Sequence, residues 1–169
     1  MAREWHIVGF QVGRETYGVP ITSLHEIVRV PTITAVLDAP SYMEGVINLR
    51  GKIVSVIDLR KRFGAKEIVT SKRNRILVLE HQGKLAGLIV DSASDVLKIP
   101  PTDIEPPPDA FQEGALNCVT GLGKCQGRLI VLLDMGKLLE HSGFRRNGEA
   151  ADARAQNSRG GDARAAAAK

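Results

Sequence analysis

The stretch GVINLRGKIVSVIDL, at residues 45–59, decides the fold because the chain repeats its pattern at residues 121–135, as GLGKCQGRLIVLLDM. Both segments carry glycine at their first and seventh positions and aspartate at the fourteenth, and their apolar residues fall at nearly the same places. In each, a run of apolar residues follows the second glycine, which is typical of a short strand after a turn. The repeat therefore predicts two similar β units in one chain.

A second pair of segments extends the repeat upstream. Residues 18–31 begin with Gly-Val and end with Val-Pro, and residues 87–100 begin with Gly-Leu and end with Ile-Pro, with similar residues at matching places between them. Each unit has room for about five strands of ordinary length. A unit this small is marginal alone, so we expect the two to share a core or to pack tightly, leaving a groove between them that suits binding.

Short apolar runs bounded by turn residues indicate further strands. They lie at residues 7–12, 75–80, 85–90 and 128–133. The second and third of these flank the turn HQGK and predict a hairpin. Many short strands with Gly and Pro turns favour a mainly β fold.

Helical signals are short. They lie at residues 23–28, 41–44, 59–64 and 135–141. Asp58 and Asp134 precede two of these segments at equivalent positions of the repeat. We interpret both aspartates as helix N-caps rather than as a catalytic pair of carboxylates.

The chain changes character at Ser142. From there it consists largely of Ala, Arg, Gly, Asp, Asn and Ser, and Phe144 is its last large apolar residue. Such a composition does not bury a core, so we expect a disordered tail at residues 142–169 behind one domain of two β subdomains at residues 1–141.

Charge is spread unevenly along the chain. Residues 1–144 hold 17 Lys and Arg against 16 Asp and Glu, a net charge of +1, whereas residues 145–169 hold 6 against 3, a net charge of +3. A nearly neutral folded part argues against a dedicated nucleic-acid surface. The N-terminus lacks the apolar core of a signal peptide and no apolar run is long enough to span a membrane, so we expect a cytoplasmic protein without membrane insertion.

Residue types that perform chemistry are present, but not in catalytic patterns. The four histidines lack metal-ligand spacing to another His or to a Cys, and Cys118 and Cys125 are too far apart along the chain for a zinc site. No phosphate loop, dinucleotide fingerprint or nucleophile elbow is found. We therefore expect no metal, no cofactor and no enzymatic activity.

A basic cluster follows the first repeat segment. Its members are Arg60, Lys61, Arg62, Lys66, Lys72, Arg73 and Arg75. The simpler interpretation is a solvated helix face with its loop, and the alternative is a site for an acidic protein or a nucleic acid. Only Phe63 is interleaved among these residues, so base stacking has little support.

The stretch EGVINLRGKIVSVIDLR, at residues 44–60, resembles the signature of the CheW family of chemotaxis coupling proteins. Asn-Leu-Arg-Gly is the most recognisable element of that signature. Three further segments, at residues 17–27, 87–97 and 120–123, resemble the family in the same order. The resemblance covers about residues 5–140.

The resemblance implies both a fold and partners. The family's fold is two intertwined five-stranded SH3-like β-barrels, which agrees with the repeat. Its members are non-enzymatic adaptors that bridge the cytoplasmic tips of methyl-accepting chemoreceptors and the regulatory domain of the histidine kinase CheA. We therefore expect a cytoplasmic scaffold that is recruited to membrane-associated receptor arrays.

The family's binding sites can be carried onto matching residues of this sequence. For the receptor-binding groove, these are Leu24, Glu26, Ile27, Gly45, Asn48, Leu49, Arg50 and Val96. For kinase binding, they are Leu122, Arg128 and Leu129. Apolar residues in such a groove suit recognition of a receptor helix.

Structural roles stay open for several of these residues. Arg50 can fork onto a carboxylate or a helix-end carbonyl of a receptor, or it can pair internally with Glu26. Leu24, Ile27 and Val96 are equally compatible with ordinary core packing. Gly45 fits a backbone requirement better than a contact. Within the repeat, Asn48-Leu49-Arg50 differs most from its counterpart Lys124-Cys125-Gln126, which favours a functional role for the first triplet.

Two other functions remain open on the sequence. The first is a CheW-like adaptor of another chemosensory pathway. The second belongs to a different class, a small-barrel nucleic-acid-binding protein that uses the basic cluster and the tail, and it predicts binding that falls steeply with salt.

Overall fold

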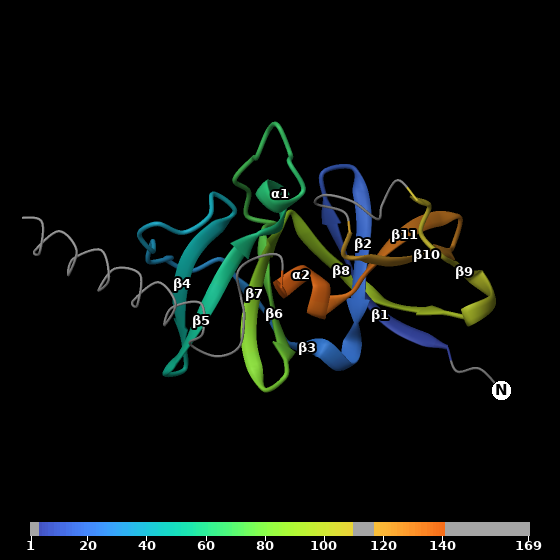
Figure 1. Ribbon diagram of the computed structural model, residues 1–169, viewed down its shortest axis with the longest axis horizontal. Coiled ribbons are helices and arrows are strands. Elements are labelled where there is room, and N and C mark those ends of the chain that lie inside the picture. The colour runs from blue at the N-terminus through green and yellow to red at the C-terminus, as the bar shows by residue number, and fades with distance from the viewer. Residues whose placement is uncertain (1–3, 110–116, 141–169) are drawn as a thin grey trace, which may run out of the picture.

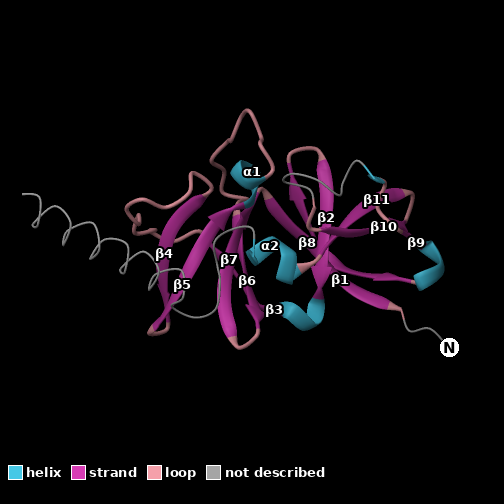
Figure 2. Cartoon of the chain, in the orientation of Figure 1, coloured by secondary structure: helices cyan, strands magenta, loops and turns pink. Residues whose placement is uncertain are grey.

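Runs of two or three strands separated by short helices make up the chain in a computed structural model that describes residues 4–109 and 117–140 (Figures 1 and 2). The strands are β1 (Trp5–Val12), β2 (Glu15–Pro20), β3 (Leu24–Arg29), β4 (Met43–Leu49), β5 (Lys52–Asp58), β6 (Arg75–His81), β7 (Lys84–Val90), β8 (Ser92–Ile99), β9 (Ile104–Glu105), β10 (Val119–Cys125) and β11 (Arg128–Leu133). The helices are the 3₁₀ turns η1 (Ile21–Ser23) and η2 (Pro101–Asp103) and the short α-helices α1 (Leu59–Arg62) and α2 (Met135–Glu140).

The strands form two sheets that exchange segments between the two halves of the sequence. One sheet has the order β8-β1-β2-β11-β10-β9 and the other has the order β3-β6-β7-β5-β4. The first two strands of the chain therefore join the C-terminal half, while the next strands join β6 and β7. Figure 1 shows the result, because blue strands lie beside orange ones on the right of the molecule. This confirms the intertwined, mainly β fold, although the two sheets are open and not closed barrels.

Apart from β9, the strands of the two sheets follow the same order, with β8-β1-β2-β11-β10 matching β3-β6-β7-β5-β4. Each contains one parallel pair, β11 beside β2 and β5 beside β7. The register shifts recur as well, between Met43 and Gly45 in β4 and between Val119 and Gly121 in β10. Matching irregularities at matching positions confirm that the sequence repeat is a structural repeat.

The core joins both sheets. The largest apolar cluster includes Phe10 and Val19 from one sheet and Leu77 and Leu88 from the other, all with no measurable exposure. Each sheet also has a smaller buried cluster built from its own strands, one around Val56 and one around Ile130. Neither unit has its full core without the other, as the small size of the units predicts.

The helical predictions are correct in two places and wrong in two. Asp58 Oδ1 accepts a hydrogen bond from the backbone N of Arg60 at 3.0 Å, and Asp134 Oδ1 accepts one from the backbone N of Lys137 at 3.1 Å, so both aspartates cap short helices. Ser23 ends η1 and residues 24–28 form most of β3, because pairing with β6 overrides local preference. Residues 41–44 form a turn and the start of β4. The predicted disordered tail lies outside the described residues.

No helix in the described part of the chain is long and apolar enough to cross a membrane.

Candidate functional site

The turn between β4 and β5 places Arg50 at the tip of a hairpin. Arg50 and Gly51 have φ angles of 51° and 86°, the positive values that two-residue hairpin turns require. Asn48 Oδ1 accepts a hydrogen bond from the backbone N of Gly51 at 2.8 Å. Asn48 therefore holds the turn, and the Arg50 side chain is left to project, with 73% of its surface exposed.

Arg50 forms an ion pair with Glu26 across the opening of its sheet. Its Nη1 lies 2.6 Å from Glu26 Oε2. Glu26 belongs to β3, the opposite edge of the sheet from β4, so the pair bridges the two edge strands. Because Arg50 is so exposed, the pair contributes only about 0.5 kcal/mol to folding. Its main effect is to fix where the guanidinium lies.

Only one of the two carboxylate oxygens of Glu26, Oε2, contacts Arg50. Only 20% of the side chain is exposed, and Oε1 is buried without a hydrogen-bond partner in the described part of the chain. A buried carboxylate oxygen normally accepts a hydrogen bond. The site therefore has an unused acceptor beside an exposed cation.

The apolar residues of the candidate site divide into exposed and half-buried ones. Ile27 is 38% exposed, beside Glu26 on β3, and Val96 is 49% exposed on β8 of the other sheet. Leu24 is half-buried against the central core, and Leu49 is half-buried against the core of its own sheet. Two of these four residues thus leave apolar surface free, while the other two also serve the core.

Gly45 has a backbone role. It is buried, its φ is 143°, and a Cβ atom there would lie 1.9 Å from the backbone oxygen of Thr34. Thr34 forms an isolated bridge with Val46, which brings the two chain segments into contact. Gly45 therefore shapes the edge beside the site and has no side chain to offer a partner.

The predicted kinase-contact residues lie together on the β10–β11 hairpin. Leu122 pairs with Val131 and packs half-buried against the central core. Arg128 and Leu129 begin β11 and are exposed, Leu129 by 49%. This hairpin belongs to the other sheet from Arg50, and Val96 of the predicted receptor groove lies on β8 of the same sheet as the hairpin.

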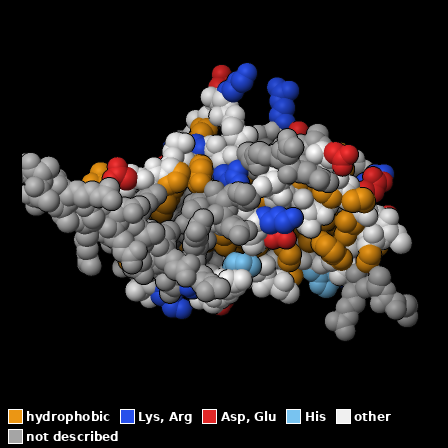
Figure 3. All heavy atoms as spheres, viewed as in Figure 1, with side chains coloured by type: hydrophobic (Ala, Val, Ile, Leu, Met, Phe, Trp, Pro, Cys, Tyr) orange, Lys and Arg blue, Asp and Glu red, His pale blue; other side chains and the backbone are white. Residues whose placement is uncertain are grey.

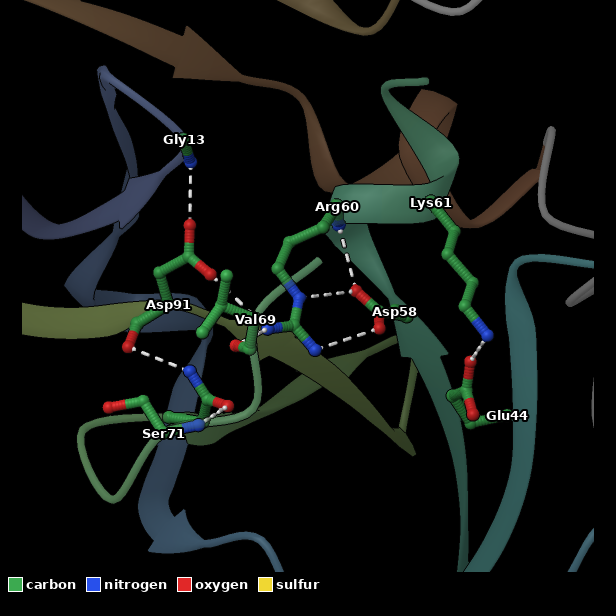
Figure 4. A network of polar contacts seen from close by, with 9 residues as sticks. Gly13, Glu44, Asp58, Arg60, Lys61, Val69, Ser71 and Asp91 are labelled. Carbon is green, nitrogen blue, oxygen red and sulfur yellow. Dashed lines mark hydrogen bonds and ion pairs between the residues drawn. The ribbon is translucent and has the colours of Figure 1, made fainter. Parts of the chain in front are cut away.

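A buried ionic network at α1 was missed by the sequence analysis. Arg60 is 6% exposed, and its Nε and Nη2 donate to the two carboxylate oxygens of Asp58 at 2.9 and 3.0 Å. Its Nη1 donates to Asp91 Oδ1 at 3.2 Å and to the backbone oxygen of Val69 at 3.1 Å (Figure 4). Hydrogen bonding to Asp58 raises the pKa of Arg60, so its charge is permanent.

The interpretation of the basic cluster as a solvated face is wrong for Arg60 and Arg62 alone, since Lys61, Lys66, Lys72 and Arg73 are exposed. Arg60 is buried, and Arg62 is 8% exposed with its guanidinium carbon 5.8 Å from the centre of the Tyr42 ring. Lys61 pairs with Glu44. The spacing Asp-Leu-Arg was a usable signal, because an aspartate cap two residues before an arginine can also pair with it. Asp91 is distant in sequence and gave no such signal.

The titratable groups whose pKa values shift do not form a reactive site. Burial raises the pKa of the Cys118 thiol and of the Tyr17 hydroxyl, which keeps both protonated at neutral pH. A protonated thiol is a poor nucleophile. Among residues 4–109 and 117–140, no group of three or more His, Cys, Asp or Glu side chains is placed to hold a metal ion.

Comparisons with known proteins agree on one family. The family model of the CheW-like domain matches residues 6–143. The chemotaxis protein CheW of Helicobacter pylori is 36% identical over 133 residues, which are 79% of this chain and 80% of that protein. Protein FrzA of Myxococcus xanthus is 33% identical over 134 residues, which are 78% of this chain and 82% of that protein.

A solved structure agrees with the sequence relatives. The crystal structure of the scaffolding protein TtCheW from Thermoanaerobacter tengcongensis matches with a TM-score of 0.75 and 40% sequence identity. The match covers 83% of this chain and 94% of that one.

Proposed function

Since this chain belongs to the CheW-like family and is an adaptor in chemotaxis signalling, we propose that it couples chemoreceptor cytoplasmic tips to the regulatory domain of the histidine kinase CheA. It does so by protein contact alone, without catalysing a reaction. In the cell it is cytoplasmic and is recruited to receptor arrays at the membrane. Residues 1–141 are the adaptor domain in this proposal.

The Glu26–Arg50 pair is the observation that carries the receptor contact. It fixes an exposed guanidinium against the edge strand β3, whose next residue, Ile27, is also exposed, so a cation and an apolar side chain both lie at this edge of the sheet. A receptor helix with an apolar stripe and an acidic or carbonyl group fits such a surface.

The receptor surface in this proposal is centred on β3 and the β4–β5 turn. It includes the residues predicted from the family, and each residue has a distinct role. Ile27 and Val96 give apolar area, Arg50 gives charge, and Asn48 and Gly45 shape the turn and the edge strand. Leu24 and Leu49 are half-buried and pack against the core.

The kinase surface in this proposal is the β10–β11 hairpin. Leu129 is the exposed apolar residue, Arg128 is the exposed cation beside it, and Leu122 anchors the hairpin to the central core. This hairpin lies in the other sheet from β3 and the β4–β5 turn, so the two proposed surfaces are centred on different sheets, as a coupling protein needs.

Reconstitution tests the proposal. Purified full-length protein is mixed with receptor cytoplasmic fragments and CheA from the same organism, and co-sedimentation is measured with CheA autophosphorylation. The proposal expects the protein to enter the complex and to make autophosphorylation depend on the receptor. A protein that binds neither partner contradicts it.

A role in a different chemosensory pathway is the alternative, because one of the relatives is named FrzA and not CheW. In that case the adaptor serves receptors and a kinase of another chemosensory system. The same reconstitution, run with each receptor and kinase set of the organism, tells the two pathways apart.

A further inference from the structure

The loop between α1 and β6, residues 64–74, carries the cations that the ionic network leaves unpaired. We call it the basic loop. Lys66, Lys72 and Arg73 stand in it against one acidic residue, Glu67. All three cations are exposed, and none forms an ion pair with another described residue. The basic loop projects beyond α1 in Figure 1, and Figure 3 shows a basic side chain beside an acidic one at the tip of that projection.

An apolar side chain is exposed among these cations. Val69 is 69% exposed, more than most large apolar residues of the described chain. A single exposed valine is ordinary on a protein surface, but here it lies between a lysine and a Lys-Arg pair on the same loop. The combination of a small apolar centre and a charged rim is typical of protein interfaces.

The basic loop is held in shape by the buried network. Arg60 donates to the backbone oxygen of Val69, and Asn74 Nδ2 donates to the backbone oxygen of Asp91 at 3.1 Å (Figure 4). Within the loop, the backbone N of Ser71 donates to Asn74 Oδ1 at 2.9 Å. Arg75 Nη1 donates to the backbone oxygen of Lys72 at 2.7 Å. A loop fixed before binding loses little conformational entropy when it binds.

We propose that the basic loop is a docking surface for an acidic protein segment, with Val69 seated against an apolar side chain between the partner's carboxylates. Charge complementarity identifies the partner as acidic. A nucleic acid fits less well because residues 64–74 contain no aromatic side chain for base stacking. This surface is distinct from the receptor and kinase surfaces proposed above and does not depend on them.

The test is an NMR titration of the full chain, labelled with ¹⁵N, with a synthetic peptide in which glutamates flank a central leucine. We expect amide shifts concentrated on residues 66–73. The double variant Lys72→Glu/Arg73→Glu should lose about tenfold or more in affinity, because two attractions become repulsions. Val69→Ser should lose a few-fold at unchanged charge and leave the salt dependence as it was.

Matched variants separate docking from general attraction. Lys84→Glu/Lys137→Glu makes the same change in net charge away from the basic loop and should keep the affinity. Spectra of the free variants, unchanged outside the substituted residues, show that each still folds. Equal weakening by both double variants, shifts spread over all surface lysines, or tighter binding of single-stranded DNA to the same loop would overturn the proposal.

Discussion

The two hairpin turns of the repeat share a backbone and differ in what they do. Arg50-Gly51 and Gln126-Gly127 have nearly the same φ angles, 51° and 86° in the first turn and 52° and 74° in the second. Arg50 reaches Glu26 on the opposite edge strand. In the second turn the ion pair is made instead by Lys124 with Glu105, 3.2 Å apart and exposed on both sides. Both turns have glycine at the position with the larger positive φ. Only the turn with Arg50 carries an ion pair that joins the two edges of its sheet.

The two helix junctions differ in the same way. Asp58 and Asp134 both cap a short helix, but Arg60 has Gly136 as its counterpart. The first junction therefore contains a buried ionic network that also fixes a loop, and the second contains a cap alone. Because the chain repeats, each residue that differs between the two halves can be compared with its counterpart in the same molecule.

The largest expected difference is between the two caps. Asp58→Ala should lower the free energy of unfolding by about 3 kcal/mol or more, because it leaves the buried Arg60 guanidinium with one carboxylate partner. Asp134→Ala removes a cap alone and should cost about 1 kcal/mol. Urea unfolding of both variants measures the gap, and equal losses would show that Arg60 is not dependent on Asp58.

The next difference is between two glycines at matching positions of β4 and β10. Gly45→Ala should cost about 2 kcal/mol or more, because Gly45 has positive φ and its Cβ would collide with the Thr34 backbone. Gly121→Ala should cost less, since Gly121 lacks a positive φ and its Cβ would lie 3.1 Å from a side-chain carbon of Ile104 and 3.2 Å from the backbone oxygen of Glu105. Thermal unfolding of the two variants compares them, and a greater loss for Gly121→Ala would contradict the assigned backbone role of Gly45.

The smallest expected effect is on stability at the turns. Arg50→Ala and Gln126→Ala should each change the free energy of unfolding by about 0.5 kcal/mol or less, because both side chains are exposed and an exposed ion pair stabilises little. Chemical denaturation checks this. A loss of several kcal/mol in Arg50→Ala would make the Glu26–Arg50 pair a structural element rather than a surface for a partner.

The repeat, the shared core and the two helix caps could be predicted because each depends on local residue types at fixed spacing. Residues 23–28 misled the prediction for a physical reason. Apolar residues at 24, 27 and 28 have helical spacing, but in β3 Leu24 and Val28 face inward while Ile27 is exposed. Ile27, an exposed apolar residue of the candidate site, thus completed a spacing that is typical of a helix.

The burial of Arg60 could not be predicted from local pattern. A run of basic residues after a strand normally marks a solvated face, and only the return of the chain at Asp91 makes burial of the guanidinium tolerable. The Glu26–Arg50 pair was foreseen as an alternative, because both residues match positions of the family's receptor-binding groove and carry opposite charges. The sequence repeat does not reveal the order of the strands in the sheet. It therefore could not show that Glu26 and Arg50 lie at opposite edges of one sheet.

The most direct test compares Arg50→Ala with Gln126→Ala in the reconstituted receptor and CheA complex. Both variants should fold with wild-type stability, so receptor-dependent kinase activity reports on coupling alone. The account predicts that Arg50→Ala loses at least tenfold in receptor control of autophosphorylation and that Gln126→Ala keeps it. Full receptor control in Arg50→Ala would contradict the assignment of the receptor surface to β3 and the β4–β5 turn.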